Sequence, residues 1–379
     1  MRRPTGCCPP ASVIAVFRSA FRIVALLASV SATTFAQPAS NPWSAVGTQG
    51  NASLRNFAFA AGGTLDTLRI HYTTLGAPRR GADGTVRNAV LVLHGTGGTG
   101  RSFLNPTYAG GLFGAGQPLD SSRYFIILPD GIGHGGSSKP SDGLHAKFPH
   151  YGYRDMVTAQ QRLLSETLGV TRLRLIIGTS MGCMHAFTWG WMYPGFADAL
   201  APLACVPTQI AGRNRMMRTL AMDAIRQDPE WKGGEYTAPP RAGLRSALQI
   251  LFIMGTAPLV QQRQAPTRDA ADSVIRAFVD SRMASTDAND FLYQFDASSD
   301  YDPSPHLPLI RVPVLHINSE DDEVNPPELR LAERLDSRMP FVRFILLPIT
   351  EQTRGHGTHS QPGIWGETLR DFLGTLATP

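Results

Sequence analysis

The chain has 379 residues, which is enough for one large domain or two modest ones. Hydrophobic residues make up 42% and charged residues 17%, a balance that is typical of a globular enzyme and too polar for a protein with many membrane spans. The 37 glycines and 29 prolines alternate with apolar runs, which indicates tight turns and long loops on a folded scaffold and excludes a disordered chain.

Residues 1–36 have the organisation of a secretory signal peptide. The segment contains four arginines and no acidic residue, an apolar stretch at 23–32, and the small-residue pattern Thr-Phe-Ala at 34–36. We expect cleavage after Ala36 and a periplasmic or secreted protein. A retained membrane anchor is the alternative, which the apolar stretch disfavours because it has about half the length of a spanning helix.

Removal of this segment changes the charge of the protein. Without its four arginines, the 35 basic residues become 31, against 30 acidic residues. The mature protein is therefore nearly neutral, and it carries no basic stripe with interleaved aromatic residues. We expect no nucleic-acid partner and, after signal removal, no membrane association.

The four cysteines fall into two pairs. Cys7 and Cys8 leave with the signal peptide, whereas Cys183 and Cys205 remain in apolar segments. A disulfide and two buried free thiols are both compatible with that setting. Because no spacing of cysteines and histidines is typical of a metal site, we expect no metal.

In chain order, residues 37–52 are predicted to be a mobile start, and 67–75 a strand. The apolar runs at 89–93 and 124–129 predict central parallel strands covered on both faces, and each precedes a glycine-rich loop, at 94–100 and 130–136. A helix is predicted at 156–168, ending before Gly169. A further strand at 173–177 leads through a sharp turn into a helix that starts near Met181.

After Pro207 the pattern changes to helical segments rich in methionine and aromatic residues. Strands and helices alternate again later in the chain, with strands at 314–318 and 342–347 and helices near 327–336 and 363–373. This order predicts an α/β core formed by residues 37–206 and 311–379, with a helical cap at 207–310 inserted after the sixth strand.

Residues 178–182, Gly-Thr-Ser-Met-Gly, match the pattern G-x-S-x-G. In that pattern a serine occupies a strained turn between strand and helix, and the flanking positions have room only for glycine. Alone the pattern arises often by chance, but here an apolar strand precedes it and a helix-compatible run follows. We predict that Ser180 is a nucleophile; a structural serine in a tight turn is the alternative.

A serine nucleophile needs a base and an orienting carboxylate, which in this arrangement follow late strands in the order acid, then histidine. After the strand at 314–318 we predict Asp322 as the acid, with Asp321 as the alternative. After the strand at 342–347 we predict His356, which is flanked by glycines. His359 is the alternative base, or a solvent-facing histidine at the start of the last helix.

An oxyanion also needs backbone donors. We predict the N–H of Met181 and the N–H of Thr96 in the glycine-rich loop at 94–98, with Gly95 in place of Thr96 as the alternative. His94, Asp130 and His134 are interpreted as structural residues that hold the glycine-rich loops.

Several segments resemble the homoserine O-acetyltransferase-like family of α/β hydrolases. They are residues 153–164, 178–189 and 193–194, and in the cap 224–231 and 233–236, with similarity over most of 60–375. The resemblance implies the α/β-hydrolase fold, a triad of Ser180, Asp322 and His356, and a ping-pong route through an acyl-serine. It implies no cofactor, and a homodimer formed through the cap.

The chain also departs from that family. Homoserine-acylating members carry an arginine two residues before the Ala-Ile of the cap motif, where this chain has Met222, and a thioether cannot bind a carboxylate as a guanidinium does. The loop at 94–98, His-Gly-Thr-Gly-Gly, is closer to that of esterases. Acetyl-CoA and homoserine are cytoplasmic, whereas the signal peptide predicts export.

We therefore predict an exported serine hydrolase that acts on small-molecule carboxylic esters through an acyl-serine. One alternative is an acyltransferase related to homoserine O-acetyltransferase with a different acceptor. Another is a non-catalytic binding protein on the same fold, which the presence of all three predicted triad residues disfavours.

Overall fold

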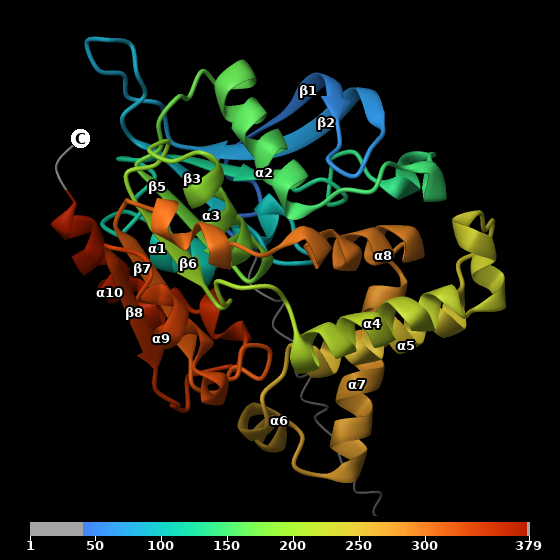
Figure 1. The fold of residues 1–379 in the computed structure, drawn as a ribbon. Helices are drawn as coiled ribbons and strands as arrows, with labels where there is room; N and C mark the ends of the chain where they lie inside the picture. Colours follow the sequence, from blue (N-terminus) through green and yellow to red (C-terminus); the bar gives the residue numbers. More distant parts are fainter. Residues whose placement is uncertain (1–40, 377–379) are drawn as a thin grey trace, which may run out of the picture. The chain divides into compact units, whose positions relative to one another are not determined.

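The computed structural model describes residues 41–376, and the predicted signal peptide lies outside the described residues. These residues form an eight-stranded sheet in the order β1-β2-β4-β3-β5-β6-β7-β8 (Figure 1). The strands are β1 (Thr48–Ala58), β2 (Thr64–Leu75), β3 (Ala89–Leu93), β4 (Phe125–Pro129), β5 (Leu175–Thr179), β6 (Leu200–Leu203), β7 (Val314–Ser319) and β8 (Val342–Leu347). The pairs β1–β2 and β2–β4 are antiparallel, and the other six strands, from β4 to β8 in the sheet order, pair in parallel.

Helices cover both faces of this sheet, which explains why its central strands are apolar throughout. In β3, Leu91 and Leu93 join one buried cluster, together with the helices α2 and α3, whereas Val90 and Val92 join a second cluster on the opposite face, together with α1 and α10. The core helices are α1 (Tyr108–Leu112), α2 (Tyr153–Arg162), α3 (Met181–Met192), α9 (Leu331–Asp336) and α10 (Pro362–Thr375). The predicted α/β-hydrolase architecture is confirmed.

The segment after the sixth strand is helical, as predicted. It contains α4 (Gly212–Arg226), α5 (Arg241–Met254), α6 (Pro258–Gln264), α7 (Arg268–Met283) and α8 (Ala288–Asp296). Of these helices, α4, α5, α7 and α8 share a buried cluster of their own. Among residues 41–376 no single helix has the length and apolarity to cross a membrane, although α5 and α6, bent by 106°, pass such a test together.

One local prediction was wrong, and a second placed the start of a helix too late. Residues 48–52 belong to β1, because Ala52 and Leu54 point into the core while their neighbours face solvent, an alternation that the mobile-start prediction overlooked. The predicted helix at 156–168 begins earlier, at Tyr153, where Asp155 accepts from the backbone N–H of Gly152, and its last turn at 163–167 is a π-helix. Gly169 ends it with a left-handed φ of 63°.

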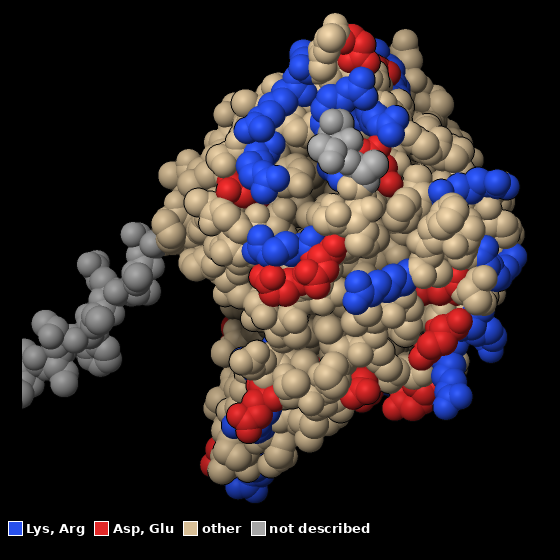
Figure 2. Space-filling view, turned by 90° about the vertical axis from the view of Figure 1, so that its left-hand side faces the viewer, with Lys and Arg blue, Asp and Glu red and all other residues tan. Residues whose placement is uncertain are grey.

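Charged side chains do not segregate by sign on the face drawn in Figure 2. Basic and acidic groups lie in mixed clusters separated by wide uncharged areas. This distribution agrees with the nearly equal numbers of basic and acidic residues after position 36.

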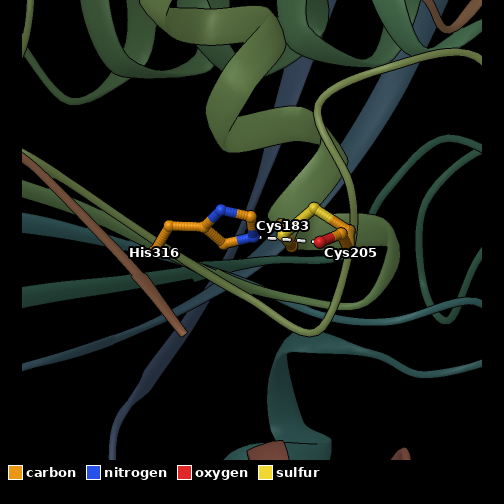
Figure 3. Close-up of side chains that lie close together, drawn as sticks. All are labelled: Cys183, Cys205 and His316. Atoms are coloured by element: carbon orange, nitrogen blue, oxygen red, sulfur yellow. Dashed lines mark hydrogen bonds between the residues drawn. A yellow bond between two sulfur atoms is a disulfide. The ribbon is translucent and has the colours of Figure 1, made fainter. Parts of the chain in front are cut away.

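The structure pairs Cys183 with Cys205, which resolves the choice left open by the sequence in favour of a disulfide (Figure 3). The bond joins α3, three residues after Ser180, to the loop that follows β6. Beside it, the buried His316 contacts the Cys205 carbonyl through Nε2 at 2.9 Å and the Asp336 carboxylate through Nδ1 at 2.7 Å. With both sulfurs in the bond and both ring nitrogens engaged, this cluster offers a metal no free ligand.

We expect loss of the disulfide to reduce stability. The bond closes a separation of 22 residues, for which the chain-entropy estimate is about 3 kcal/mol of unfolding free energy. Cys183→Ala, Cys205→Ala and the double variant should lose the same amount, because each removes the same bond. Urea unfolding with and without reductant measures it, and an unchanged midpoint in all three variants would contradict the role.

Asp290 connects the cap to the core. This α8 residue accepts hydrogen bonds from the backbone N–H of Ser141, at 2.9 Å, and from its hydroxyl, at 2.6 Å. Burial raises the pKa of Asp290 to about 6, with Asp287 adding to the shift and the Ser141 hydrogen bonds opposing it. The fold therefore favours the protonated form of this carboxyl group.

Because the pKa of Asp290 is raised in the folded state, the protein is expected to lose stability as pH rises. Protonated Asp290 stabilises the folded state. Its contribution to the unfolding free energy is complete below the pKa that Asp290 has in the unfolded chain, and it is lost as pH rises through the folded pKa of about 6. Between pH 4.5 and 7 the unfolding free energy of the wild type should fall relative to that of Asp290→Asn by about 2 kcal/mol. Urea unfolding of both proteins at the two pH values measures this, and parallel pH profiles would refute it.

Candidate active site

Ser180 occupies a strained turn between β5 and α3. Its φ of 55° and ψ of −113° are unusual for a residue with a side chain. A Cβ on Gly178 would lie 2.0 Å from the carbonyl oxygen of Gly182, and one on Gly182 would lie 2.1 Å from that of Leu93. Both flanking positions therefore require glycine, for the physical reason that the sequence pattern implied.

Three predicted side chains meet at this turn. The Ser180 Oγ lies 2.8 Å from Nε2 of His356, and Nδ1 of His356 lies 2.9 Å from Oδ2 and 3.1 Å from Oδ1 of Asp322. The serine follows β5, the aspartate follows β7 and the histidine follows β8, so residues 176 positions apart converge at the carboxyl edge of the parallel sheet. An ionised carboxylate can only accept, so Nδ1 carries the proton and Nε2 is free to accept from the serine.

Asp322 is held as an anion. Burial alone would raise the pKa of this carboxyl, but the electrostatic interaction with His356 and hydrogen bonds from His356, Asn325 and Val324 lower it overall. The Asn325 amide donates to both Asp322 Oδ2 and the Ala204 carbonyl. Asn325 was not predicted as a site residue, because its only signal in the sequence is its place three residues after the acid, within the same turn.

Asp321, the alternative acid, has a different position. One of its oxygens accepts from the backbone N–H of Gly355 at 2.8 Å, and the other accepts from the hydroxyl of Ser319 at 2.5 Å. Gly355 has a left-handed φ of 60°, and a Cβ there would lie 2.5 Å from that of Ala257. Asp321 thus holds the backbone of the histidine loop and does not contact the imidazole.

His359, the alternative base, packs edge-on against His356 with ring centroids 5.3 Å apart. Its Nδ1 pairs with the hydroxyl of Ser360 at 3.0 Å. Burial and the proximity of His356 lower the pKa of His359 to about 3, so this ring stays neutral. It supports the orientation of His356 and does not reach the serine hydroxyl.

The two glycine-rich loops are tied together by the residues interpreted as structural. His94 contacts the Gly95 carbonyl through Nδ1 and accepts from the Gly131 N–H through Nε2, both at 2.9 Å. Asp130 accepts from the backbone N–H groups of Gly100 and Gly136. Burial lowers the pKa of His134 to about 3, which makes it a neutral core residue.

The candidate oxyanion donors lie beside the serine. Met181 is the first residue of α3, where a backbone N–H has no intrahelical acceptor. A Cβ built on Gly95 would lie 3.2 Å from the Ser180 Cβ, so the loop that carries Thr96 packs directly against the nucleophile. Neither geometry selects between Thr96 and Gly95, and the Thr96 assignment stays a prediction.

A cleft of about 300 Å³ separates these loops from the cap. Its core side is formed by the loops around Thr96 and Gly133, and its cap side by α5, α7 and α8, including Leu248 and Phe291. Met222 is buried in the cap cluster, so the thioether noted in the sequence is a core contact. The cleft gives a small molecule a route to the loop beside Ser180.

Comparisons with known proteins agree with this arrangement. A profile of the alpha/beta hydrolase fold family matches residues 88–340. The homoserine O-acetyltransferase of Moorella thermoacetica is 39% identical over 51% of this chain and 54% of its own length, so the alignment spans about half of that relative. A probable acyltransferase of Methanothermobacter thermautotrophicus is 28% identical over 85% of this chain and 96% of its own.

Solved structures share the same fold. An acetylester hydrolase from Corynebacterium glutamicum superposes with a TM-score of 0.76 over 86% of this chain and 96% of its own, at 23% identity. The predicted resemblance to the homoserine O-acetyltransferase-like group is confirmed by the relatives found. The chain belongs to the α/β-hydrolase fold family.

Proposed function

We propose that the mature chain is an exported serine hydrolase that cleaves carboxylic esters through an acyl-serine intermediate. The observation that carries this proposal is the continuous hydrogen-bonded series from the Ser180 hydroxyl through His356 to Asp322, with distances of 2.8 and 2.9 Å. A serine is a weak nucleophile unless a base removes its proton, and this series supplies both the base and the carboxylate that orients it.

In the first half-reaction the Ser180 oxygen attacks the ester carbonyl carbon while its proton passes to Nε2 of His356. The carbonyl π electrons move to oxygen, and the resulting oxyanion accepts hydrogen bonds from the N–H groups of Met181 and Thr96. Collapse of this intermediate breaks the bond to the alkoxy group, which leaves as an alcohol after taking the proton from His356. Asp322 stabilises the imidazolium during these steps.

The second half-reaction releases the acyl group. Water attacks the acyl-serine carbonyl, His356 accepts one of its protons, and the new tetrahedral intermediate expels the serine oxygen, which recovers a proton from His356. The products are a carboxylic acid and free enzyme. No metal or cofactor takes part in this scheme.

An acyltransferase with another acceptor is the second candidate, because the curated relatives include homoserine O-acetyltransferases. The loop sequence His-Gly-Thr-Gly-Gly and the methionine at position 222 favour the hydrolase. A panel of short-chain esters with and without acetyl-CoA and alcohol acceptors, beside Ser180→Ala, separates the two. Conversion of the esters to free acid supports the hydrolase proposal. If the esters stay intact and acetyl-CoA is consumed only when an acceptor is present, the chain is an acyltransferase and the hydrolase proposal fails.

The proposed export rests on two independent features. The first is the signal-like segment at 1–36, and the second is the Cys183–Cys205 disulfide, since such bonds persist mainly in oxidising compartments. Fractionation of expressing cells with N-terminal sequencing tests it. A mature protein that starts at Gln37 outside the cytoplasm is expected, and an uncleaved chain in the cytoplasm would contradict the proposal.

We also propose a homodimer formed through the cap. The cap exposes four large apolar side chains, which a second copy of the chain would cover: Met216 and Leu220 on α4 are 66% and 60% exposed, and Ile253 on α5 and Leu259 on α6 are both 55% exposed. Sedimentation of wild type beside Leu220→Asp tests this assignment. A dimer that dissociates in the variant supports it, and a wild-type monomer at micromolar concentration would exclude it.

A further inference from the structure

Arg218 of α4 is a buried cation whose hydrogen-bond partners in the described part of the chain are neutral. Its side chain is 4% exposed. Nε donates to the Asn214 side chain at 2.9 Å and one terminal nitrogen to the Ser298 hydroxyl at 3.3 Å, both of them neutral partners. Within residues 41–376 no carboxylate forms an ion pair with it.

Two acidic side chains on neighbouring elements have other partners. Asp300 accepts from the backbone N–H groups of Tyr153 and Arg154, and Asp296 pairs with His150. The aromatic ring of Phe295 lies 5.4 Å from the guanidinium carbon, which gives a cation–π contact but no charge neutralisation. A buried unpaired charge is costly, so its presence indicates a partner that arrives with the substrate.

Two neighbouring hydroxyl groups also lack partners. Tyr153 is fully buried, and neither its hydroxyl nor the Thr96 Oγ1 has a partner with hydrogen-bonding geometry in the described part of the chain. Arg218 and Thr96 both lie close enough to the Tyr153 hydroxyl to oppose the rise that burial causes in its pKa. Arg218 therefore has only neutral acceptors, and the two hydroxyl groups beside it have no partner with hydrogen-bonding geometry among the described residues.

This neighbourhood adjoins the reaction centre. Thr96 follows Gly95, which packs against Ser180, and Thr96 and Phe295 both line the cleft between core and cap. A ligand in the cleft thus reaches Thr96, on the loop beside the nucleophile, and Phe295, whose ring contacts Arg218. Met222 lies four residues after Arg218 on the same helix, and both side chains are buried.

We propose that Arg218, together with the hydroxyl groups of Tyr153 and Thr96, forms a subsite for a carboxylate of the substrate, so that the enzyme prefers esters that carry a second, anionic group. This inference deepens the proposed ester hydrolysis and rests on it. A guanidinium donates two parallel hydrogen bonds to a carboxylate, and a tyrosine and a threonine hydroxyl donate to its remaining lone pairs.

The subsite is tested with isosteric substrate pairs. Methyl hydrogen succinate against methyl pentanoate places the carboxylate on the acyl half, and β-acetoxypropanoate against butyl acetate places it on the alcohol half. We expect the wild type to show at least a tenfold higher kcat/KM for the anionic member of one pair, mainly through KM. Arg218→Met should lose that ratio and Arg218→Lys should retain part of it.

The matched control is Arg226→Met, which removes an exposed cation from the same helix and should leave the ratio unchanged. Thermal unfolding separates binding from a structural role. Replacing an unpaired buried charge by methionine should preserve or raise Tm, whereas a lowered Tm with an unchanged substrate ratio would overturn the proposal in favour of a structural arginine.

Binding without turnover distinguishes failure of the subsite from failure of the proposed function. In Ser180→Ala, β-acetoxypropanoate or methyl hydrogen succinate should raise Tm more than its neutral isostere, and Arg218→Met should abolish the difference. If no ester is cleaved but this shift is found, the subsite stands and the hydrolase proposal fails. If esters are cleaved without a preference for either anion and no shift occurs, the subsite is refuted.

Discussion

Ser180→Ala and His356→Ala are each expected to lower kcat for ester cleavage by about four to six orders of magnitude, and the double variant by no more than either single one. The reason is that the hydroxyl and the imidazole act as one unit. Without the imidazole 2.8 Å away the hydroxyl keeps its proton, and without the hydroxyl the imidazole has nothing to activate.

Initial-rate kinetics of the three variants on one nitrophenyl ester measure this non-additivity. Circular dichroism and thermal unfolding serve as controls, because neither substitution empties a large volume in the core. Independent effects that multiply in the double variant would show that the two side chains do not act on the same step.

Asp322→Asn is also expected to have a large effect: kcat should fall by about four orders of magnitude, with little change in KM. An asparagine amide turned toward His356 would donate to Nδ1 and force the proton onto Nε2, which then cannot accept from Ser180. The lowered pKa of Asp322 shows that the wild-type site holds this group as the anion it needs.

The matched control is Asp321→Asn. That side chain has the same charge and neighbouring position, but it supports the Gly355 backbone and the Ser319 hydroxyl. We expect a loss of less than about a hundredfold, caused by displacement of the histidine loop. A larger loss in Asp321→Asn than in Asp322→Asn would reverse the assignment of the two acids.

The sequence predicted the parts of the site that depend on strand order. Apolar strands, the Gly-x-Ser-x-Gly turn and the late aspartate and histidine all follow from local patterns combined with the rule that the carboxyl ends of parallel strands meet at one edge. The glycines at 178 and 182 are examples, since the steric reason inferred from the pattern is the contact found in the structure.

The features that were not predicted depend on contacts between distant segments. Whether Cys183 and Cys205 bond depends on how closely α3 and the loop after β6 approach, which no spacing along the chain reveals. The burial of Arg218 likewise cannot be predicted from the sequence. Arg213 and Arg215 lie on the same helix and have the same side chain, and only the structure shows that Arg218 is buried and the other two are not. The same holds for Asp290, whose partner lies 149 residues earlier.

Covalent labelling of the mature protein with a fluorophosphonate tests the central claim most directly. Activated serines react with this probe and ordinary serines do not. Mass spectrometry of wild type should find one adduct per chain, on the peptide that contains Ser180, with labelling absent in Ser180→Ala and strongly slowed in His356→Ala. An unlabelled wild type, or an adduct on another serine that persists in Ser180→Ala, would contradict the assignment of Ser180 as the nucleophile.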